Sequence, residues 1–154
     1  MRRTQGHLAS SLLVLTLGLG GRQFGQPAQS WQADIQIRTL EVRKSKTQVS
    51  ARVVIYTQHD DDALDARLLI LLPVGVGIER LDTGCVATPG PSNVPSLRAA
   101  VTCELGSIPD RGFREVGITM TLPTGGQQKR IGVFTYSGTP DPMPGNNYAE
   151  RTIP

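Results

Sequence analysis

The stretch VSARVVIY, residues 49–56, decides the fold because its side chains alternate in character. Val49, Ala51, Val53 and Ile55 are apolar, and residues such as Ser50 and Arg52 stand between them. A period of two residues is typical of a β-strand that buries one face. The stretch therefore predicts a strand in a sheet that packs against a core on one side.

The same period recurs on both sides of this stretch. The other segments that predict strands are residues 34–42, 67–72, 78–81, 97–105, 116–122 and 131–135. Between Ile37 and Leu40 the apolar phase shifts, which predicts a β-bulge. Gly- and Pro-rich segments separate the strands, as do a polar turn at residues 59–66 and an irregular loop at residues 88–95.

This series predicts an all-β domain of about seven short strands over residues 34–154. No segment in that range shows a sustained apolar period of 3.6 residues, so we expect no long helix. Strands separated by frequent turns are typical of an antiparallel β-sandwich. A barrel is the alternative, but the irregular strand spacing favours two packed sheets.

The N-terminal segment has the layout of a secretory signal peptide. Arg2 and Arg3 precede an uncharged apolar run at residues 8–19, and small residues at 18 and 20 offer a cleavage site. The run is short for a membrane span. We therefore expect a signal peptide at residues 1–20, with cleavage as late as residue 33, and a flexible lead-in at residues 21–33. The alternatives are an uncleaved anchor and a buried core helix.

This assignment predicts an exported protein that is periplasmic, secreted or on the cell surface, with no stable membrane span after signal removal. It also accounts for the basic charge. The net charge of +3 comes from 16 basic against 13 acidic residues, and removal of Arg2 and Arg3 leaves 14 against 13, or +1. Strong phosphate binding needs clustered basic residues, so we expect no nucleic-acid partner.

Two cysteines, Cys85 and Cys103, are the only ones in the chain. In an exported protein an even number of cysteines predicts a disulfide. The bridge would close a loop over residues 86–102 and stabilise the fold by about 3 kcal/mol on the chain-entropy estimate.

The C-terminal stretch TPDPMPGNNYAE, residues 139–150, predicts a corner followed by a closing strand. Neither Asn146 nor Asn147 has Ser or Thr two residues later, so the stretch is no N-glycan acceptor. Pro144-Gly145 is a turn signal. We expect residues 148–153 to form a paired strand.

The order of these features resembles a known bacterial extracellular repeat domain, domain of unknown function eleven, which is an immunoglobulin-like β-sandwich. The segments that carry the resemblance are DDDALDA (60–66), LP (72–73), GC (84–85), VTCELG (101–106), VGITMTL (116–122) and DPMPGNNYA (141–149). The resemblance covers residues 34–154. It implies a location at the cell surface or envelope, a spacer, stalk or adhesion role, and no catalytic residues.

We therefore expect a non-enzymatic structural or protein-interaction module of the bacterial envelope or surface. Its partner would be another envelope or surface protein, or a second copy of itself. In residues 67–72, Leu68, Ile70 and Leu72 would face the core, which leaves Leu69 and Leu71 facing outward. These two leucines are the candidate partner surface, although single surface leucines are also common in monomeric proteins.

The alternative is a secreted module that binds calcium or a glycan through the loops at residues 59–65 and 88–95. Asp60, Asp61, Asp62 and Asp65 offer the carboxylate oxygens that Ca²⁺ prefers, although their spacing is not that of an EF-hand. Otherwise we expect no cofactor. His59 lacks a recognisable nucleophile motif around it, so we expect no hydrolase activity.

Overall fold

The computed structural model describes residues 31–58, 61–89, 97–122 and 129–154. Nine strands and one short 3-10 turn lie in this part of the chain. They are β1 (Asp34–Ser45), β2 (Gln48–Gln58), β3 (Ala63–Pro73), β4 (Gly77–Leu81), β5 (Cys85–Pro89), β6 (Leu97–Ile108), β7 (Phe113–Thr121), β8 (Arg130–Tyr136), η1 (Pro144–Asn146) and β9 (Tyr148–Thr152).

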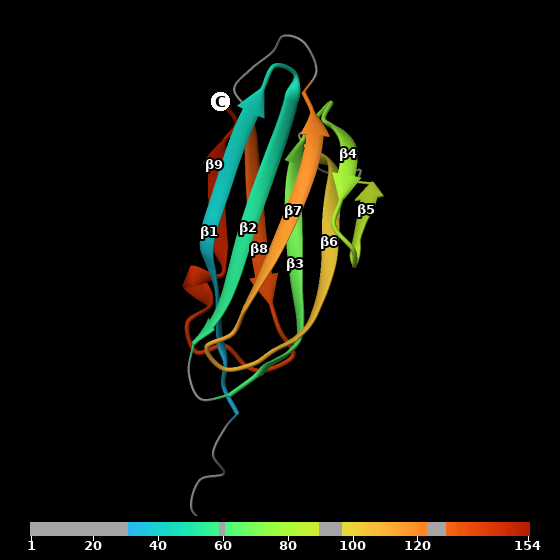
Figure 1. Cartoon of the computed structure of the whole chain (residues 1–154). Coiled ribbons are helices and arrows are strands. Elements are labelled where there is room, and N and C mark those ends of the chain that lie inside the picture. Colours follow the sequence, from blue (N-terminus) through green and yellow to red (C-terminus); the bar gives the residue numbers. More distant parts are fainter. Residues whose placement is uncertain (1–30, 59–60, 90–96, 123–128) are drawn as a thin grey trace, which may run out of the picture.

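The strands form two antiparallel sheets that pack face to face (Figure 1). One sheet has the order β1-β2-β7-β4 and the other has the order β5-β6-β3-β8-β9. The prediction of an all-β antiparallel sandwich is confirmed. The chain enters at the end of the sandwich where β1 begins and leaves at the opposite end, where β9 stops (Figure 1).

The core lies between the sheets and is built from the alternating segments. In β2, Val49, Val53 and Ile55 are fully buried, as the opening pattern predicts. Leu68 and Ile70 of β3 face them from the other sheet and are also fully buried. Each such side chain contributes about 1.5–3 kcal/mol through its removal from water, so the alternation supplies the main stabilising term.

Two irregularities shape the strands. The predicted bulge in β1 is confirmed, because its pairing with β2 shifts register between Ile37 and Thr39. The polar turn expected at residues 59–66 is partly wrong, because β3 already begins at Ala63. Asp65 adopts a positive φ of 49° and the register shifts around it, so Ala63 and Ala66 both reach the core.

The estimate of about seven strands is too low. The most clearly missed element is β5, whose residues 86–88 are exposed and whose sequence CVATP has no apolar period. An edge strand with little burial leaves no such pattern in the sequence. The loop expected at residues 88–95 likewise overlaps β5 at its first two positions, and its remainder lies outside the described residues.

The C-terminal stretch forms a corner that holds the start of β1. Asp141 accepts hydrogen bonds from the backbone N–H groups of Ile35 (3.3 Å) and Met143 (2.7 Å). The Asn146 side chain donates to the buried Asp34 carboxylate at 2.8 Å. After this corner β9 pairs with β8 along its whole length, which confirms the predicted closing strand.

Candidate interaction surface

The outer face of the five-stranded sheet carries the two leucines that the sequence singles out. Leu68, Ile70 and Leu72 are fully buried in the core, whereas Leu69 and Leu71 point outward and are half-buried. Their predicted orientation is therefore correct. They lie on β3, the central strand of this sheet.

Leu69 belongs to a row of side chains that crosses all five strands. The register aligns one outward residue from each strand: Val86, Thr102, Leu69, Phe134 and Tyr148. We call this row the ridge. Val86 is 64% exposed, Tyr148 51% and Phe134 37%, whereas Leu69 and Thr102 are half-buried.

A second row runs beside the ridge, two residues away from it on each strand. It comprises Thr88, Ala100, Leu71, Gly132 and Glu150, and we call it the furrow. Ala100 and Gly132 are buried although they lie on the outer face. The Tyr148 ring covers Gly132, where an added Cβ would lie 3.3 Å from the tyrosine hydroxyl. Small residues thus lie beside larger ones at Ala100 and Gly132, whereas Thr88 and Glu150 in the same row are exposed.

Aromatic side chains gather at the β8 end of the ridge. Phe134 stacks on Tyr136, with ring centroids 6.0 Å apart and planes inclined by 25°. Tyr148 donates its hydroxyl hydrogen to Glu150 at 2.9 Å. This bond raises the pKa of Tyr148 and, together with Arg130, lowers the pKa of Glu150.

Charged residues border the two rows as ion pairs within the chain. Arg67 Nε lies 3.1 Å from Glu104, and an Arg130 nitrogen lies 2.9 Å from Glu150. Both pairs are exposed to solvent, which screens them, so they add little to stability. Their effect on this face is to cancel charge at its borders.

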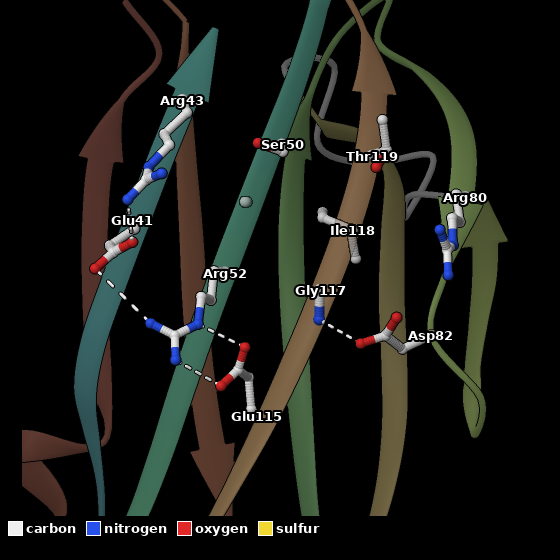
Figure 2. Close-up of a pocket in the computed structure, with 11 residues that line it drawn as sticks. Glu41, Arg43, Ser50, Arg52, Arg80, Asp82, Glu115, Gly117, Ile118 and Thr119 are labelled. Carbon is white, nitrogen blue, oxygen red and sulfur yellow. Dashed lines mark hydrogen bonds and ion pairs between the residues drawn. The ribbon is translucent and has the colours of Figure 1, made fainter.

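The opposite sheet has a hollow of about 550 Å³ on its outer face, over β2 and β7 (Figure 2). Gly117 and Ser50 lie in its floor, and charged side chains stand around them. Arg52 donates two hydrogen bonds to Glu115 and lies 3.9 Å from Glu41. These two hydrogen bonds from Arg52 lower the pKa of Glu115.

Each carboxylate of this hollow already has a partner within the chain. Glu41 and Glu115 pair with arginines, and Asp82 accepts the Gly117 N–H at 2.6 Å. The acidic groups are therefore engaged in holding strands together. In the part of the chain that the structure describes, no group of three or more His, Cys, Asp or Glu residues could hold a metal ion.

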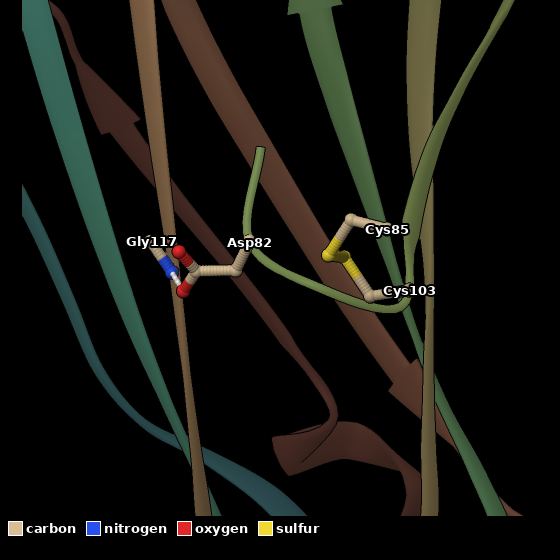
Figure 3. The surroundings of a disulfide bond; sticks show 4 residues. All are labelled: Asp82, Cys85, Cys103 and Gly117. Atoms are coloured by element: carbon tan, nitrogen blue, oxygen red, sulfur yellow. Dashed lines mark hydrogen bonds between the residues drawn. A yellow bond between two sulfur atoms is a disulfide. The ribbon is translucent and has the colours of Figure 1, made fainter. Parts of the chain in front are cut away.

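The disulfide predicted from the cysteine count is present between Cys85 and Cys103 (Figure 3). The two residues lie opposite each other on β5 and β6, within one sheet. The turn that leads into β5 starts at Asp82, whose carbonyl accepts the Cys85 N–H at 3.2 Å. Asp82 and the disulfide thus fasten the segment where the chain passes from one sheet to the other.

The acidic residues proposed as calcium ligands serve different neighbours. Asp61 accepts the Gln32 N–H at 2.8 Å, and Asp62 accepts the Asp110 N–H at 3.0 Å. Asp65 is exposed, while Asp60 and His59 lie outside the described residues. Calcium binding by this loop stays a prediction.

Most residues of the ridge were not predicted from the sequence. The alternation of Ile131, Val133 and Thr135 implies that Phe134 and Tyr136 point outward, and this signal was available. Val86 and Tyr148 could be added only by knowing which strands are neighbours, because they lie at the two edges of the sheet.

No described helix is both long and apolar enough to cross a membrane. No protein-family model matches the chain, and no curated protein sequence matches it. The resemblance to domain of unknown function eleven therefore stays a prediction.

Solved structures are similar to this chain at the level of fold. The CARDB domain of a Pyrococcus furiosus protein matches 80% of this chain and 94% of its own, with 11% identity and a TM-score of 0.50. A cohesin module from a Clostridium perfringens family 33 glycoside hydrolase matches 80% of this chain and 96% of its own, with 10% identity and a TM-score of 0.39. A family GH18 chitinase from Chromobacterium violaceum matches 76% of this chain but 21% of its own, with 14% identity and a TM-score of 0.42. The similarity to the CARDB domain supports the assignment of the chain to the β-sandwich domains.

Proposed function

We propose that the protein is a non-enzymatic, exported interaction module of a bacterial envelope or surface, and that it docks through the ridge. The observation that carries the proposal is a row of outward side chains across five paired strands, in which the exposed Val86, Phe134 and Tyr148 flank the half-buried Leu69. A contiguous apolar patch is uncommon on a monomeric protein and is typical of an interaction site.

The composition of the face supports docking to a protein. Aromatic residues are enriched at the cores of protein interfaces, and unpaired charges are depleted there. Phe134, Tyr136 and Tyr148 supply aromatic area, and the neighbouring arginines are neutralised by Glu104 and Glu150. A rigid sheet presents these side chains with little loss of backbone entropy on binding.

The disulfide supports the exported location. Disulfides form and persist in oxidising compartments and are rare in the cytosol of most organisms. Cys85 and Cys103 lie on an edge strand and its neighbour, where a bridge compensates for the small area that β5 buries.

The proposal is tested by Leu69→Glu, with Phe113→Glu as the matched control. Phe113 is 63% exposed and lies at the end of β7 on the other sheet. Chemical crosslinking in envelope preparations measures the association of the chain with bound protein. We expect Leu69→Glu to lose the association that the wild-type chain shows. We expect Phe113→Glu to keep it. Circular dichroism would verify that both variants are folded. Equal association of both folded variants would contradict the proposal.

A further inference from the structure

We propose that the hollow on the four-stranded sheet is a binding site for a neutral oligosaccharide. The hollow has a volume of about 550 Å³ (Figure 2), which is within the range of sites for small ligands. It lies on the opposite sheet from the ridge. None of the described residues that line it belongs to the loops at residues 59–65 and 88–95. The inference therefore goes beyond the proposed function and does not depend on it.

The floor of the hollow is low because small residues face each other on its two central strands. Ser50 of β2 lies opposite Thr119 of β7, and Gly117, which has no side chain, is the next outward residue of β7. Ser50 is exposed, Thr119 is half-buried and both line the hollow. Their hydroxyl groups can therefore donate hydrogen bonds to a ligand and also accept them.

An arginine and a carboxylate stand together at each side of this floor (Figure 2). On β1, Arg43 lies 3.3 Å from Glu41, and on the side of β4, Arg80 and Asp82 both line the hollow. Within the described residues Arg80 forms no ion pair, and Asp82 accepts the Gly117 N–H with one of its two oxygens. Each side thus keeps N–H donors and carboxylate oxygens for a ligand.

The balance of charge in the hollow indicates a neutral ligand. Three arginines and three carboxylates line it, and Arg52 in its middle is held by Glu115 and lies near Glu41. Such a set gives no advantage to an anion or a cation, but it places donors beside acceptors. Each hydroxyl of a sugar both donates and accepts hydrogen bonds, so neighbouring sugar hydroxyls are complementary to an arginine beside a carboxylate.

The extent and composition of the hollow indicate an oligosaccharide rather than a protein. The register places one row across all four strands, formed by Arg43, Ser50, Thr119 and Arg80. Three strand spacings of about 4.8 Å give this row a length of about 14 Å, so a chain of several sugar units could contact both arginines. None of the described lining residues is aromatic, whereas the anchors of protein interfaces are rich in aromatic side chains. The bidentate Arg52–Glu115 pair and the rigid sheet hold the polar groups in place before a ligand arrives, which lowers the entropy lost on binding.

The test is an NMR titration of the oxidised, isotope-labelled chain with three neutral tetrasaccharides: cellotetraose, maltotetraose and the tetramer of N-acetylglucosamine. We expect at least one of them to shift the amide signals of Ser50, Thr119 and Arg80 and to leave those of the five-stranded sheet unchanged. Arg80→Met keeps a long side chain and removes the donors, so it should weaken binding about tenfold, the effect of losing about one hydrogen bond from a charged donor. Arg111→Met is the matched control. It removes an equally charged, exposed arginine from the turn between β6 and β7 and should bind like the wild type.

A second variant tests the floor of the hollow. Thr119→Val keeps the branched shape and removes the hydroxyl, so we expect it to weaken binding while circular dichroism shows the same fold. Equal affinities of the Arg80→Met and Arg111→Met variants would overturn the proposal, as would the absence of shifts with all three tetrasaccharides at millimolar concentration. Binding of tetragalacturonate, an acidic tetrasaccharide, without binding of any neutral one would show an anion site instead. None of these results bears on docking through the ridge, which the Leu69→Glu experiment tests separately.

Discussion

The Asp82 side chain continues the hydrogen bonding along β7 beyond the point where β4 ends. β4 pairs with β7 only as far as Leu81 and Ile118, and the Asp82 carboxylate then accepts the next available N–H, that of Gly117. The close approach depends on the missing side chain, because a Cβ on Gly117 would lie 3.3 Å from that carboxylate. One side chain thus extends the edge of the four-stranded sheet.

We expect Asp82→Ala to lower the free energy of unfolding by about 1–2 kcal/mol, because it leaves the part-buried Gly117 N–H without its acceptor. Asp82→Asn retains a carbonyl oxygen at the same place and should lose much less. Urea denaturation of both variants measures the difference. Equal loss in the two variants would show that the hydrogen bond is not the source of the effect.

The pKa of Glu150 offers a second test at the scale of single residues. Its carboxylate accepts a hydrogen bond from Tyr148 and pairs with Arg130, and both interactions lower its pKa below the ordinary value of 4.5. A carboxyl group with a lowered folded pKa adds stability above its unfolded pKa, and that stability is lost as the pH falls through the folded pKa. NMR titration should therefore place the Glu150 carboxyl below its ordinary range.

Tyr148→Phe should raise the pKa of Glu150 toward that range, because it removes the larger of the two causes and keeps Arg130. Glu115, whose pKa is lowered by Arg52 on the opposite sheet, is the internal control and should titrate as before. An unchanged Glu150 titration would contradict the hydrogen bond between Tyr148 and Glu150.

At the scale of elements, β5 is an edge strand that the disulfide fastens to its neighbour β6. It contributes five residues at the edge of its sheet and is paired on one side only. The bridge joins it to β6 within the same sheet, so it does not link the two layers of the sandwich. Loss of the bridge should therefore loosen one edge before it loosens the core.

We expect Cys85→Ser with Cys103→Ser to lower the free energy of unfolding by about 2–4 kcal/mol, the range typical of a bridge of this loop length. In hydrogen exchange, the β5 amides should lose protection first, while those of β2 keep theirs relative to global unfolding. Denaturant titration with residue-resolved exchange measures both. Simultaneous loss of protection in β2 and β5 would argue against a local role.

The strands also show how much of the fold and site could be read from sequence. Alternation located the buried faces of β2, β3, β6, β7 and β8, and a phase shift located the bulge in β1. It failed for β5 and for the start of β3, where burial is slight or the backbone is irregular. Leu69 and Leu71 followed from alternation within one strand, but the ridge depends on pairing between distant segments. Those neighbours are set by the packing of the whole sandwich and leave no local signal.

At the scale of the whole molecule, the two outer faces differ in character. One face presents the ridge and furrow with its charges cancelled at the borders, and the other presents a hollow surrounded by ion pairs. The core is the same for both, so each face can change without altering the other. The matched control at Phe113 relies on this separation, because it introduces a charge on the four-stranded sheet and leaves the five-stranded sheet intact.

The chain enters and leaves at opposite ends of the sandwich, and this has a mechanical consequence (Figure 1). Tension applied to the two ends of the described chain would pull β1 along β2 and β9 along β8, both of which are antiparallel pairs. Such a load is shared by all the hydrogen bonds of a pair at once, so they must break together. The disulfide would keep residues 86–102 from extending after the strands had separated. The same arrangement of strands that buries the core is thus suited to bearing force.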